Sequence, residues 1–545
     1  MKGGSAPLSV LAIVLAGVIR ADSQERGKPS SFFHTSDRCM ACHNGLVTET
    51  GEDVSIGTEW RASMMANSSR DPYWQAAVRR ETMDHPKAKA AIEDMCSTCH
   101  MPMARFTART QGREGEIFAH LPVTRAETED ERLAADGVSC AVCHGIQPEG
   151  LGTEESFTGG FVVDTASPWD SRPIFGPFEI DHGLAAIMRS ATGFVPTQAP
   201  HVQSSELCAT CHTLFTEALG PNGELLGRLP EQVPYLEWRH SGYRDEQTCQ
   251  SCHMPLVATD TPIASVLGEP RAGFSRHVFR GGNFFMLKML NRYRVELGVT
   301  AGPQELDTAA SLTVEHLQSS SAVIRLSRAD LAAGRLDVEV AVENLGGHKL
   351  PTAYPSRRAW LHVTVRDGGG RLVFESGRLD ESGAIDGNDN DDDPSRYEPH
   401  YTAITRPDEV QIYEAIMVDS EGRVTTGLAS GLRFVKDNRI LPRGFDKGTA
   451  DDDVAVRGRA LEDPDFSGEG DRVRYAVDVS GARGPFHVEA ELWYQPIAYR
   501  WARNLASYDS FETQRFVTYY ESMSELSGVV LARSEANVPG AGRPN

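Results

Sequence analysis

The sequence predicts an α+β protein made of two consecutive parts. All ten cysteines fall between residues 39 and 252, in segments that carry helix-capping signals. After residue 305 the chain instead alternates apolar and polar side chains with the period of a β-strand. We therefore expect a helix and loop domain over residues 22–300, followed by an antiparallel, β-sandwich-like domain over residues 301–545.

The first residues predict export. Lys2 is followed by the apolar run Pro7–Ile19, which has the length of a signal-peptide core. We expect a signal peptide over residues 1–21 and a periplasmic or extracellular protein. Because Ile19 occupies a position where a small residue is usual, an uncleaved N-terminal anchor is the alternative. No other stretch approaches ~18 consecutive apolar residues, so no further membrane span is expected.

Helix boundaries can be read in the first part. Asp71-Pro72 has the pattern of an N-cap residue followed by a first-turn proline. Gly137 is expected to close a helix that runs through residues 129–135. Asn283 is expected to cap a further helix through residues 285–290. These elements surround the cysteine pairs and predict helices joined by loops.

Each cysteine pair is followed at once by a histidine, which gives five Cys-x-x-Cys-His motifs. Two intervening residues bring both thiols to one side of a helical turn, where they can add to the vinyl groups of a porphyrin. The adjacent imidazole then lies under the iron as proximal ligand. The motifs therefore predict five covalently bound haem c groups. The cysteines are Cys39, Cys42, Cys96, Cys99, Cys140, Cys143, Cys208, Cys211, Cys249 and Cys252, and the proximal ligands are His43, His100, His144, His212 and His253.

Zinc and disulfide chemistry fit this pattern less well. Structural zinc joins cysteine pairs two by two, and five pairs cannot be divided in that way. Disulfides or thioredoxin-like pairs would suit an exported protein, but neither explains the histidine after every pair. The motifs use all ten cysteines and leave none for a disulfide or a catalytic thiol.

The sixth iron ligand decides between electron transfer and catalysis, and twelve histidines outside the motifs are available. Strand alternation places His362 and His487 on polar faces, and His316 is expected at the surface. His85 and His201 lie close to motifs along the chain. Methionine is a softer alternative ligand, and Met64-Met65 is a candidate whose competing interpretation is core packing.

An internal echo predicts a duplicated unit. The order of motif, Glu59–Ser63 (EWRAS) and motif recurs later as motif, Glu237–Ser241 (EWRHS) and motif. Residues 22–300 supply only about 56 residues for each of five haems, too few to insulate the porphyrins. We therefore expect the haems to form much of the core and to lie close together.

The second part reads as β-structure with one acidic loop. Alternation over residues 336–342, 361–365 and 486–494 predicts half-buried antiparallel strands. The stretch Asp386–Asp393 begins like a calcium loop but lacks the glycine at position six and the distal glutamate of an EF-hand. A solvated acidic loop is the expectation, and a calcium site is the alternative.

Three further stretches carry a family resemblance: the His-Met-Pro extensions after two motifs, the segment His277–Asn283, and the segment Asn344–Thr352. Together with the motifs they resemble exported bacterial multihaem c-type cytochromes related to the tetrahaem cytochromes of ammonia oxidisers. The resemblance implies that His277 and His348 are distal ligands and that His348 brings the β-domain onto a haem. Two glycines before His348 would leave room for a porphyrin edge.

These observations predict an electron-transfer protein whose five haems are all or mostly bis-histidine ligated. No catalytic residue is assigned. One alternative is an oxidoreductase with one open haem acting on a small nitrogen or sulfur species, although no CxxCK motif occurs. Another is an extracellular, filament-forming conductive cytochrome. The distal candidates are His277, His348, His201, His85 and His120.

Charge bounds the partners. The chain holds 54 Lys and Arg against 76 Asp and Glu, a net charge of -22, which disfavours nucleic acid and anionic lipid. Each bis-histidine ferric haem adds roughly -1 once its propionates are counted. Redox partner proteins with basic docking surfaces are therefore expected, and a homo-oligomer is compatible with the sequence.

Overall fold

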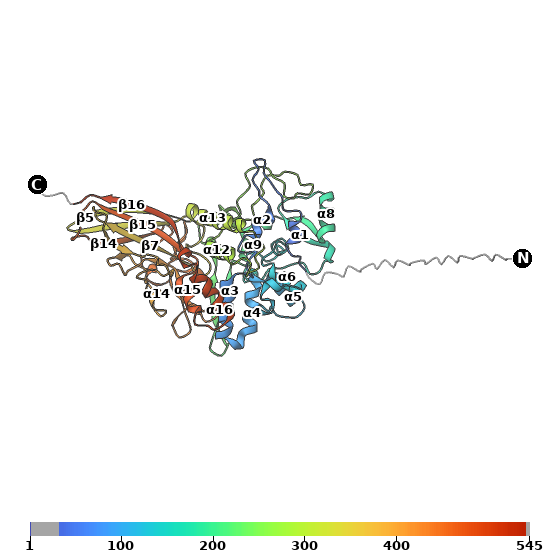
Figure 1. Cartoon of the computed structure of the whole chain (residues 1–545), viewed down its shortest axis with the longest axis horizontal. Coiled ribbons are helices and arrows are strands. Elements are labelled where there is room, and N and C mark those ends of the chain that lie inside the picture. Colours follow the sequence, from blue (N-terminus) through green and yellow to red (C-terminus); the bar gives the residue numbers. More distant parts are fainter. Residues whose placement is uncertain (2–31, 541–545) are drawn as a thin grey trace.

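The α+β class is confirmed by the computed structural model, which describes Met1 and residues 32–540. Figure 1 shows the helices gathered in one half of the molecule and the long strands in the other, with the C-terminus at the outer end of the strands. Apart from Met1, the predicted signal peptide lies outside the described residues. Within the described part of the chain, no helix is both long enough and apolar enough to cross a membrane.

Thirteen α-helices are described before the long strands begin. The two longest of the early ones, α3 and α4, lie side by side at the bottom of Figure 1. The helices are α1 Asp37–Met40, α2 Ile56–Arg61, α3 Pro72–Asp84, α4 Lys89–His100, α5 Pro102–Thr110, α6 Glu129–Ala135, α7 Cys140–Cys143, α8 His182–Thr192, α9 Ser205–Ala209, α10 Pro234–Arg239, α11 Cys249–His253, α12 Phe284–Arg292 and α13 Pro303–Ser320.

The capping signals are largely confirmed. The carboxylate of Asp71 accepts hydrogen bonds from the backbone N–H groups of Tyr73 and Trp74 at the start of α3. Gly137 has a φ of 63°, which suits the turn after α6. Asn283 precedes α12, but its side chain makes no cap, because its buried Oδ1 has no hydrogen-bond partner. The sequence therefore predicted where α12 starts, but the predicted cap by the Asn283 side chain is absent.

Two small sheets interrupt the helical part, which the sequence reading did not predict. Strands β1 (Arg172–Gly176) and β2 (Phe194–Gln198) pair in parallel around α8. Strands β3 (Leu214–Leu219) and β4 (Leu225–Gln232) form a hairpin with two register shifts. Each strand is short and irregular in burial, so the period of two that marks longer strands is absent from the sequence.

The C-terminal part contains twelve strands and three short helices. They are β5 Ala322–Ala332, β6 Arg335–Asn344, β7 Arg358–Arg366, β8 Leu372–Ser376, α14 Asp389–Asp392, β9 Ala403–Ile404, β10 Ile412–Tyr413, β11 Ala415–Val418, β12 Val424–Thr425, β13 Arg433–Asp437, β14 Asp471–Asp478, β15 Phe486–Gln495, α15 Tyr499–Leu505, α16 Phe511–Glu521 and β16 Val529–Val538.

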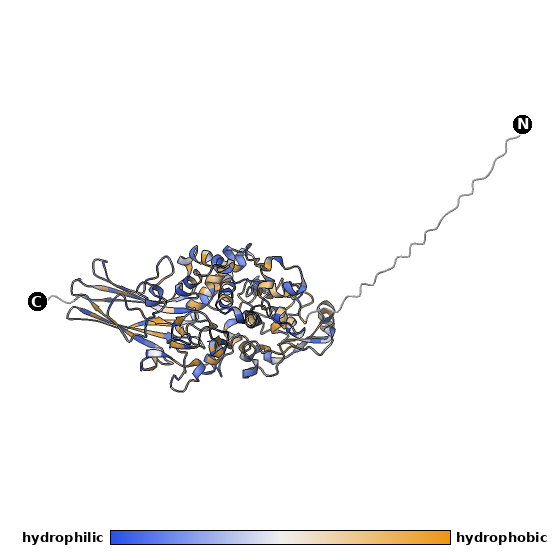
Figure 2. Ribbon diagram, turned by 90° about the horizontal axis from the view of Figure 1, so that it is seen from below, coloured by the Kyte–Doolittle hydropathy of each residue, from blue (hydrophilic) through white to orange (hydrophobic). Residues whose placement is uncertain are grey.

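Two principal sheets share one core in this part. One has the order β10-β7-β15-β16, with β8 paired to β7, and the other has the order β5-β6-β14-β9. Alternate residues of β6 and β14 are buried, and they contact buried residues of β7 and β15. In Figure 2 the apolar residues gather toward the middle of the molecule, whereas peripheral loops are mostly hydrophilic. The alternation predicted for β6 thus identified a strand that supplies one face to the core, whereas β7 is buried on both faces along almost its whole length.

The helical and β parts pack directly against each other. Helix α16 lies on α3, where Arg79 forms a bidentate ion pair with Glu512 at 2.9 Å. Tyr73 of α3 contacts the ring of Phe516, and buried residues of both parts belong to one apolar cluster. This contact surface places the loop that follows β6, which carries His348, against the motif-bearing helices.

Candidate haem-binding site

Each motif begins in or completes a helix. The first lies at α1, the second ends α4, the third is α7, the fourth overlaps α9 and the fifth is α11. One helical turn brings two thiols separated by two residues to the same side. None of the ten cysteines is in a disulfide, although several face one another across motifs. The arrangement is the one that attachment of two vinyl groups per motif requires.

Four of the five motif histidines bond to a backbone carbonyl through Nδ1. This bond fixes the tautomer with the proton on Nδ1 and leaves the Nε2 lone pair for a metal. The acceptors come from segments far away in sequence, so the tertiary fold orients each imidazole. The pairs are His43 with Ile263 O at 2.6 Å, His100 with Ser68 O at 3.0 Å, His144 with Phe175 O at 2.6 Å, and His253 with Arg280 O.

The motif imidazoles are not fully packed by protein. His212 is exposed, although desolvation by the protein around it lowers the pKa of its ring. His144 and His253 are deeper but partly accessible. A closely packed interior leaves few accessible spaces next to imidazoles. The chemistry of the donor set and the space beside it therefore fit a large planar metal cofactor.

Two histidines outside the motifs face motif histidines across a fixed distance. The ring centroids of His144 and His277 are 6.2 Å apart with the planes inclined by 20°, and those of His253 and His348 are 6.2 Å apart at 13°. A metal–imidazole bond of ~2.0 Å plus a ring radius of ~1.2 Å on each side predicts ~6.4 Å for two rings on one metal. The observed spacing therefore matches axial ligands of a single iron.

Both of these outer imidazoles have the matching tautomer. His277 Nδ1 bonds to Ser275 O at 3.0 Å, and His348 Nδ1 bonds to Lys349 O at 3.1 Å. Burial lowers the pKa of His277 to about 3 and that of His253 to about 4, so these rings are neutral near pH 7. A neutral ring with a free Nε2 is the ligand form of histidine.

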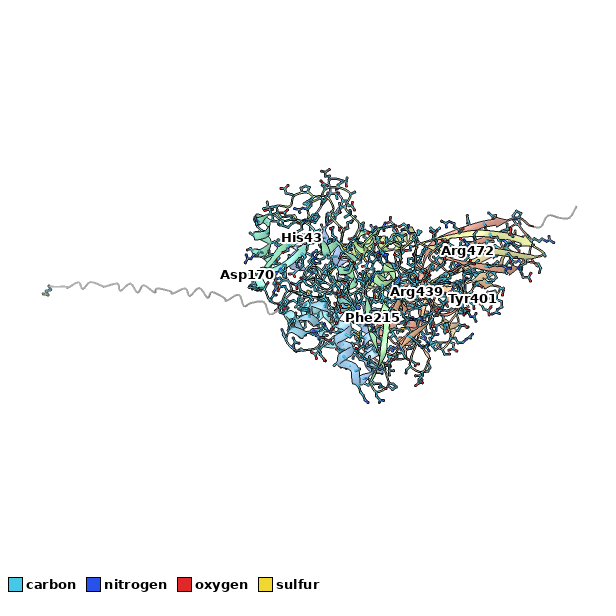
Figure 3. The ribbon with its side chains drawn as sticks, turned by 180° about the vertical axis from the view of Figure 1, so that it is seen from behind. His43, Asp170, Phe215, Tyr401, Arg439 and Arg472 are labelled. Atoms are coloured by element: carbon cyan, nitrogen blue, oxygen red, sulfur yellow. The ribbon has the colours of Figure 1, made fainter. Side chains whose placement is uncertain are left out.

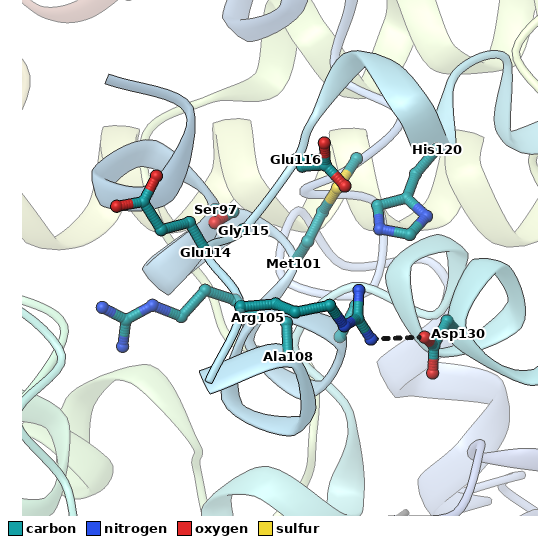
Figure 4. A pocket seen from close by; sticks show the side chains of 11 residues that line it. Ser97, Met101, Arg105, Ala108, Glu114, Gly115, Glu116, His120 and Asp130 are labelled. Carbon is teal, nitrogen blue, oxygen red and sulfur yellow. Dashed lines mark hydrogen bonds and ion pairs between the residues drawn. The ribbon is translucent and has the colours of Figure 1, made fainter. Parts of the chain in front are cut away.

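The other distal candidates have different surroundings. His85 is buried, and its Nε2 bonds to Ser430 Oγ at 2.9 Å; His201 Nε2 bonds to Ile146 O at 2.9 Å, with its ring edge on Phe175. His120 lines a narrow pocket beside Met101, and its buried Nδ1 has no partner (Figure 4). None of these three faces a motif imidazole as His277 and His348 do among the described ring contacts.

One histidine near the site was not predicted. His316, expected at the surface, is half-buried on α13, and its ring centroid is 6.0 Å from that of His253 with the planes at 63°. Along α13 the buried residues are Leu306, Ala310, Thr313 and Leu317. His316 directly precedes the buried Leu317, so it lies at the border of the buried face of α13. This position was the only sign in the sequence that His316 is partly buried.

The motifs are connected in an order that differs from their order in the chain. Thiols, which stand for the thioether sulfurs of attached haem, lie close enough for one to shift the pKa of the other between motifs one and three (Cys39 with Cys140), two and four (Cys99 with Cys211), and four and five (Cys208 with Cys249). Motifs three and four are linked through Cys143, whose charge acts on the thiols of Cys208 and Cys211 in the fourth motif. The spatial order is therefore one, three, four, with two and five both adjacent to four.

A second cluster of potential metal ligands lies in the β part and has a different character. His400, Asp463 and Asp471 are buried, with ligand atoms within 4.8 Å of one another. The side-chain N–H groups of Gln411 and Asn438 point at His400 Nδ1, because their oxygens accept backbone N–H bonds. Nδ1 is thus the acceptor, and the proton on Nε2 bonds to Asp463 at 3.0 Å. The cluster is a hydrogen-bond network rather than an open donor set.

The acidic stretch after residue 385 is held by arginines. Asp386 pairs with Arg378 and Asp389 with Arg396, both at 2.6 Å. The ion pair of Asp391 with Arg358, at 2.9 Å, is almost completely buried, so this part of the stretch differs from the solvated loop that was expected. The arginines supply the positive charge that a calcium ion would otherwise supply.

Comparison with known proteins finds a similarity of fold. No protein-family model matches the chain, and no curated protein matches it. Among solved structures, a penta-heme cytochrome c552 from Thermochromatium tepidum is similar, with a TM-score of 0.52 and 16% sequence identity. The similarity covers 93% of this chain and 99% of that chain. The fold of this chain is therefore similar to that of this penta-heme cytochrome over most of the length of both chains.

Proposed function

We propose that the chain is an exported electron-transfer protein that carries five haem c groups. Ten motif cysteines form the thioether bonds, and the five motif histidines are the proximal ligands. Bound haem iron supplies a one-electron couple, which two imidazole ligands keep low-spin. The observation that carries the proposal is the pair of ring separations of 6.2 Å, between His144 and His277 and between His253 and His348.

On this basis His277 is the distal ligand opposite the third motif, and His348 is the distal ligand opposite the fifth. His85, His120 and His201 are proposed for the remaining positions. His85 bonds through Nε2 to the Ser430 hydroxyl and His201 bonds through Nε2 to the Ile146 carbonyl, so each ring would have to turn to reach an iron. His316 is added as a further candidate because its ring lies beside that of His253.

The contacts between motifs support a continuous route. Motif one lies at one end and contacts motif three, which is next to motif four. Motifs two and five both adjoin motif four, so the route branches there. Cys252 of the fifth motif is exposed, which makes that end accessible from solvent. Donor and acceptor proteins are proposed to meet different ends, and the strongly acidic chain favours partners with basic docking surfaces.

The stoichiometry is tested by a pyridine haemochrome measurement on the purified protein. Five haems per chain are expected, and substantially fewer would refute the proposal. Electron paramagnetic resonance of the ferric protein tests the ligation. Low-spin signals that account for every haem support electron transfer.

A second candidate function, catalysis at one open haem, has one observation in its favour. Among the described ring contacts, three motif histidines, His43, His100 and His212, face no second imidazole. Of these, His212 has a cation, Arg357, whose charge acts after burial to lower its pKa. An open position beside a cation could bind a small nitrogen or sulfur oxyanion. One haem equivalent of high-spin ferric signal that changes on addition of nitrite or sulfite would favour this function.

A further inference from the structure

The duplicated sequence places a buried glutamate in the same structural position twice. Glu59 of α2 and Glu237 of α10 both begin the repeated Glu-Trp-Arg pattern. In both copies the tryptophan Nε1 donates to a distant carbonyl at 3.0 Å, from Trp60 to Val138 and from Trp238 to Gln247. The echo is therefore structural as well as sequential, and each glutamate is fixed by its own helix.

Each glutamate holds the backbone that carries an outer histidine. Glu59 accepts a hydrogen bond from the backbone N–H of His277 at 2.8 Å. Glu237 accepts one from the backbone N–H of Lys349, the residue after His348, at 3.1 Å. Their side chains are 8% and 0% exposed, so no solvent competes for these bonds.

An arginine completes each arrangement. Arg276, which precedes His277, pairs with Glu59, and Arg439 pairs with Glu237 at 2.8 Å. Each buried carboxylate therefore has a partner of opposite charge and accepts a backbone N–H. The same three-part device thus recurs beside two histidines that the fold brings to different motifs.

We propose that Glu59 and Glu237 are positioning residues that hold His277 and His348 in place as distal iron ligands. The inference rests on the proposed bis-histidine ligation. Neither glutamate touches the metal, and each acts through the backbone of the ligand segment. Duplication of one unit explains why the device occurs twice.

The test uses the holoprotein with Glu59→Gln, Glu237→Gln and the double variant. Each single change removes the negative charge that pairs with the arginine. It also places the amide NH₂ of glutamine near the backbone N–H of His277 or Lys349. We expect one low-spin ferric signal in five to be lost or converted to high-spin in each single variant, and two in the double variant. A shift in the reduction potential of one haem should accompany each change.

Glu52→Gln is the matched control, because Glu52 also pairs with Arg276 but is 54% exposed and does not bond to His277. It should leave all five signals unchanged. If a glutamine variant does not fold, Glu59→Asp tests the same contact with the charge kept. Wild-type signals in Glu59→Gln, Glu237→Gln and the double variant would overturn the inference while leaving the proposed bis-histidine ligation intact. A wild-type protein with fewer low-spin haems would instead overturn the ligation itself.

A separate surface observation concerns the first motif. Residues 254–275 fold back on themselves through bridges between Leu256 and Ser275 and between Thr261 and Arg271, and they cover the loop over residues 44–56. We call these two segments the cap. The cap projects from the helical half in Figure 3, with His43 near its base. His43 Nδ1 bonds to Ile263 O, and Cys42 O accepts from Ser265 N at 2.8 Å.

The cap exposes apolar side chains at positions where solvent exposure is unfavourable. Leu267 is 70% exposed and has a φ of 53°, a conformation that a side chain with a Cβ rarely adopts. Leu256 is 62% exposed, Val47 is 51% exposed and Val266 is 43% exposed. A strained backbone that keeps a leucine in solvent at a loop tip has no advantage for folding and is typical of contact sites.

The charge around this apolar group indicates its partner. Segments 44–56 and 254–276 hold five carboxylates and two arginines, and Arg276 is occupied by Glu52 and Glu59. An acidic rim around a small apolar centre complements a basic rim on a partner. A second copy of this chain, with net charge -22, would be repelled.

We infer that the cap is the docking surface for a small basic redox protein, which would exchange electrons with the first motif. The probe is a lysine-rich small c-type cytochrome, mixed by stopped flow with the reduced holoprotein. Leu267→Gly should lower the second-order rate several-fold and relieve the backbone, and the wild-type rate should fall steeply with ionic strength.

Leu225→Gly is the matched control, since Leu225 is 62% exposed at the start of β4, outside the cap. Its rate should equal that of the wild type. Equal slowing by both variants, or a rate that does not depend on salt, would overturn the inference. Size-exclusion chromatography that shows a dimer lost on Leu267→Gly would also overturn it, because the surface would then bind a second copy.

Discussion

The buried charge network next to His348 yields a quantitative prediction for Asp437→Asn. Lys349 Nζ is fully buried and bonds to Asp437 Oδ2 at 2.8 Å, and Arg439 bonds to the same carboxylate at 2.7 Å. Burial alone would raise the pKa of Asp437, but the two cations outweigh it and hold the pKa well below its ordinary value. In the variant Arg439 keeps its ion pair with Glu237, whereas Lys349 Nζ loses the carboxylate it bonds to.

The size of the loss follows from the lysine. Removing one partner of a buried pair costs ~3–5 kcal/mol. Deprotonation of Lys349 limits the loss of stability. Neutralising this lysine at pH 7, which is about 3.5 units below its ordinary pKa of 10.5, costs ~1.4 kcal/mol per unit, or about 5 kcal/mol. This limit falls as pH rises, to roughly 2 kcal/mol at about pH 9.

The assay is denaturant unfolding followed by far-ultraviolet circular dichroism at several pH values. The variant should lose ~3–5 kcal/mol at pH 7 and less at higher pH, and Lys349→Met in the same background should recover most of the loss. A loss below ~1 kcal/mol at pH 7, or one that stays constant up to about pH 9, would refute the reasoning.

Three further predictions concern single side chains. His348→Met should raise the reduction potential of one haem and leave the other four unchanged in a potentiometric titration, because a thioether ligand favours Fe(II). Burial lowers the pKa of His362, but the hydrogen bonds that its ring donates to Glu491 and Glu375 raise the pKa by more, so the net pKa lies above 6.5. The stability that His362 contributes is therefore complete below pH 6.5 and is lost as pH rises through the folded-state pKa. The melting temperature of His362→Gln should accordingly lie below that of the wild type at about pH 5.5 and approach it at about pH 9. Phe284→Ala, at a fully buried position on α12, should cost ~3–5 kcal/mol in calorimetry, and a cost below ~1 kcal/mol would show that α12 packs loosely.

Local patterns predicted the parts of the fold that depend on local rules. Strands β6, β7 and β15 coincide with the predicted alternations. Burial alternates along β6, as a half-buried strand requires, but β7 is buried on both faces apart from His362 and its last residue, so the half-buried prediction was wrong for β7. His362 and His487 were expected on a polar face. His487 is 36% exposed, but His362 is 17% exposed, because Glu491 and Glu375 from neighbouring strands flank it. Alternation gives the face, whereas the register between strands decides which groups cover it.

The ligand geometry could not be predicted from the residues alone. His348 reaches His253 only through packing of the β part on the helices, whereas His277 reaches His144 through packing of distant segments within the helical part. Residue spacing predicts which side chains share a face of one helix or strand, but it does not predict contacts between segments that are far apart in the chain. The repeated glutamates were visible as an echo in the sequence, but their partners, the N–H groups of His277 and Lys349, lie in segments outside the repeat.

The contacts of Glu237 explain why the β part belongs with the helical part. Glu237 lies on α10, between motifs four and five, and it binds Lys349, Thr352 and Arg439, all from the β part. Because Glu237 is fully buried, separating the two parts would expose an interface of opposite charges and take His348 away from His253. The same network therefore joins the two parts and fixes the position of His348, the proposed iron ligand. A β-domain whose only role was to bind a partner could be attached by a flexible linker, whereas a domain that supplies a ligand must be held rigidly.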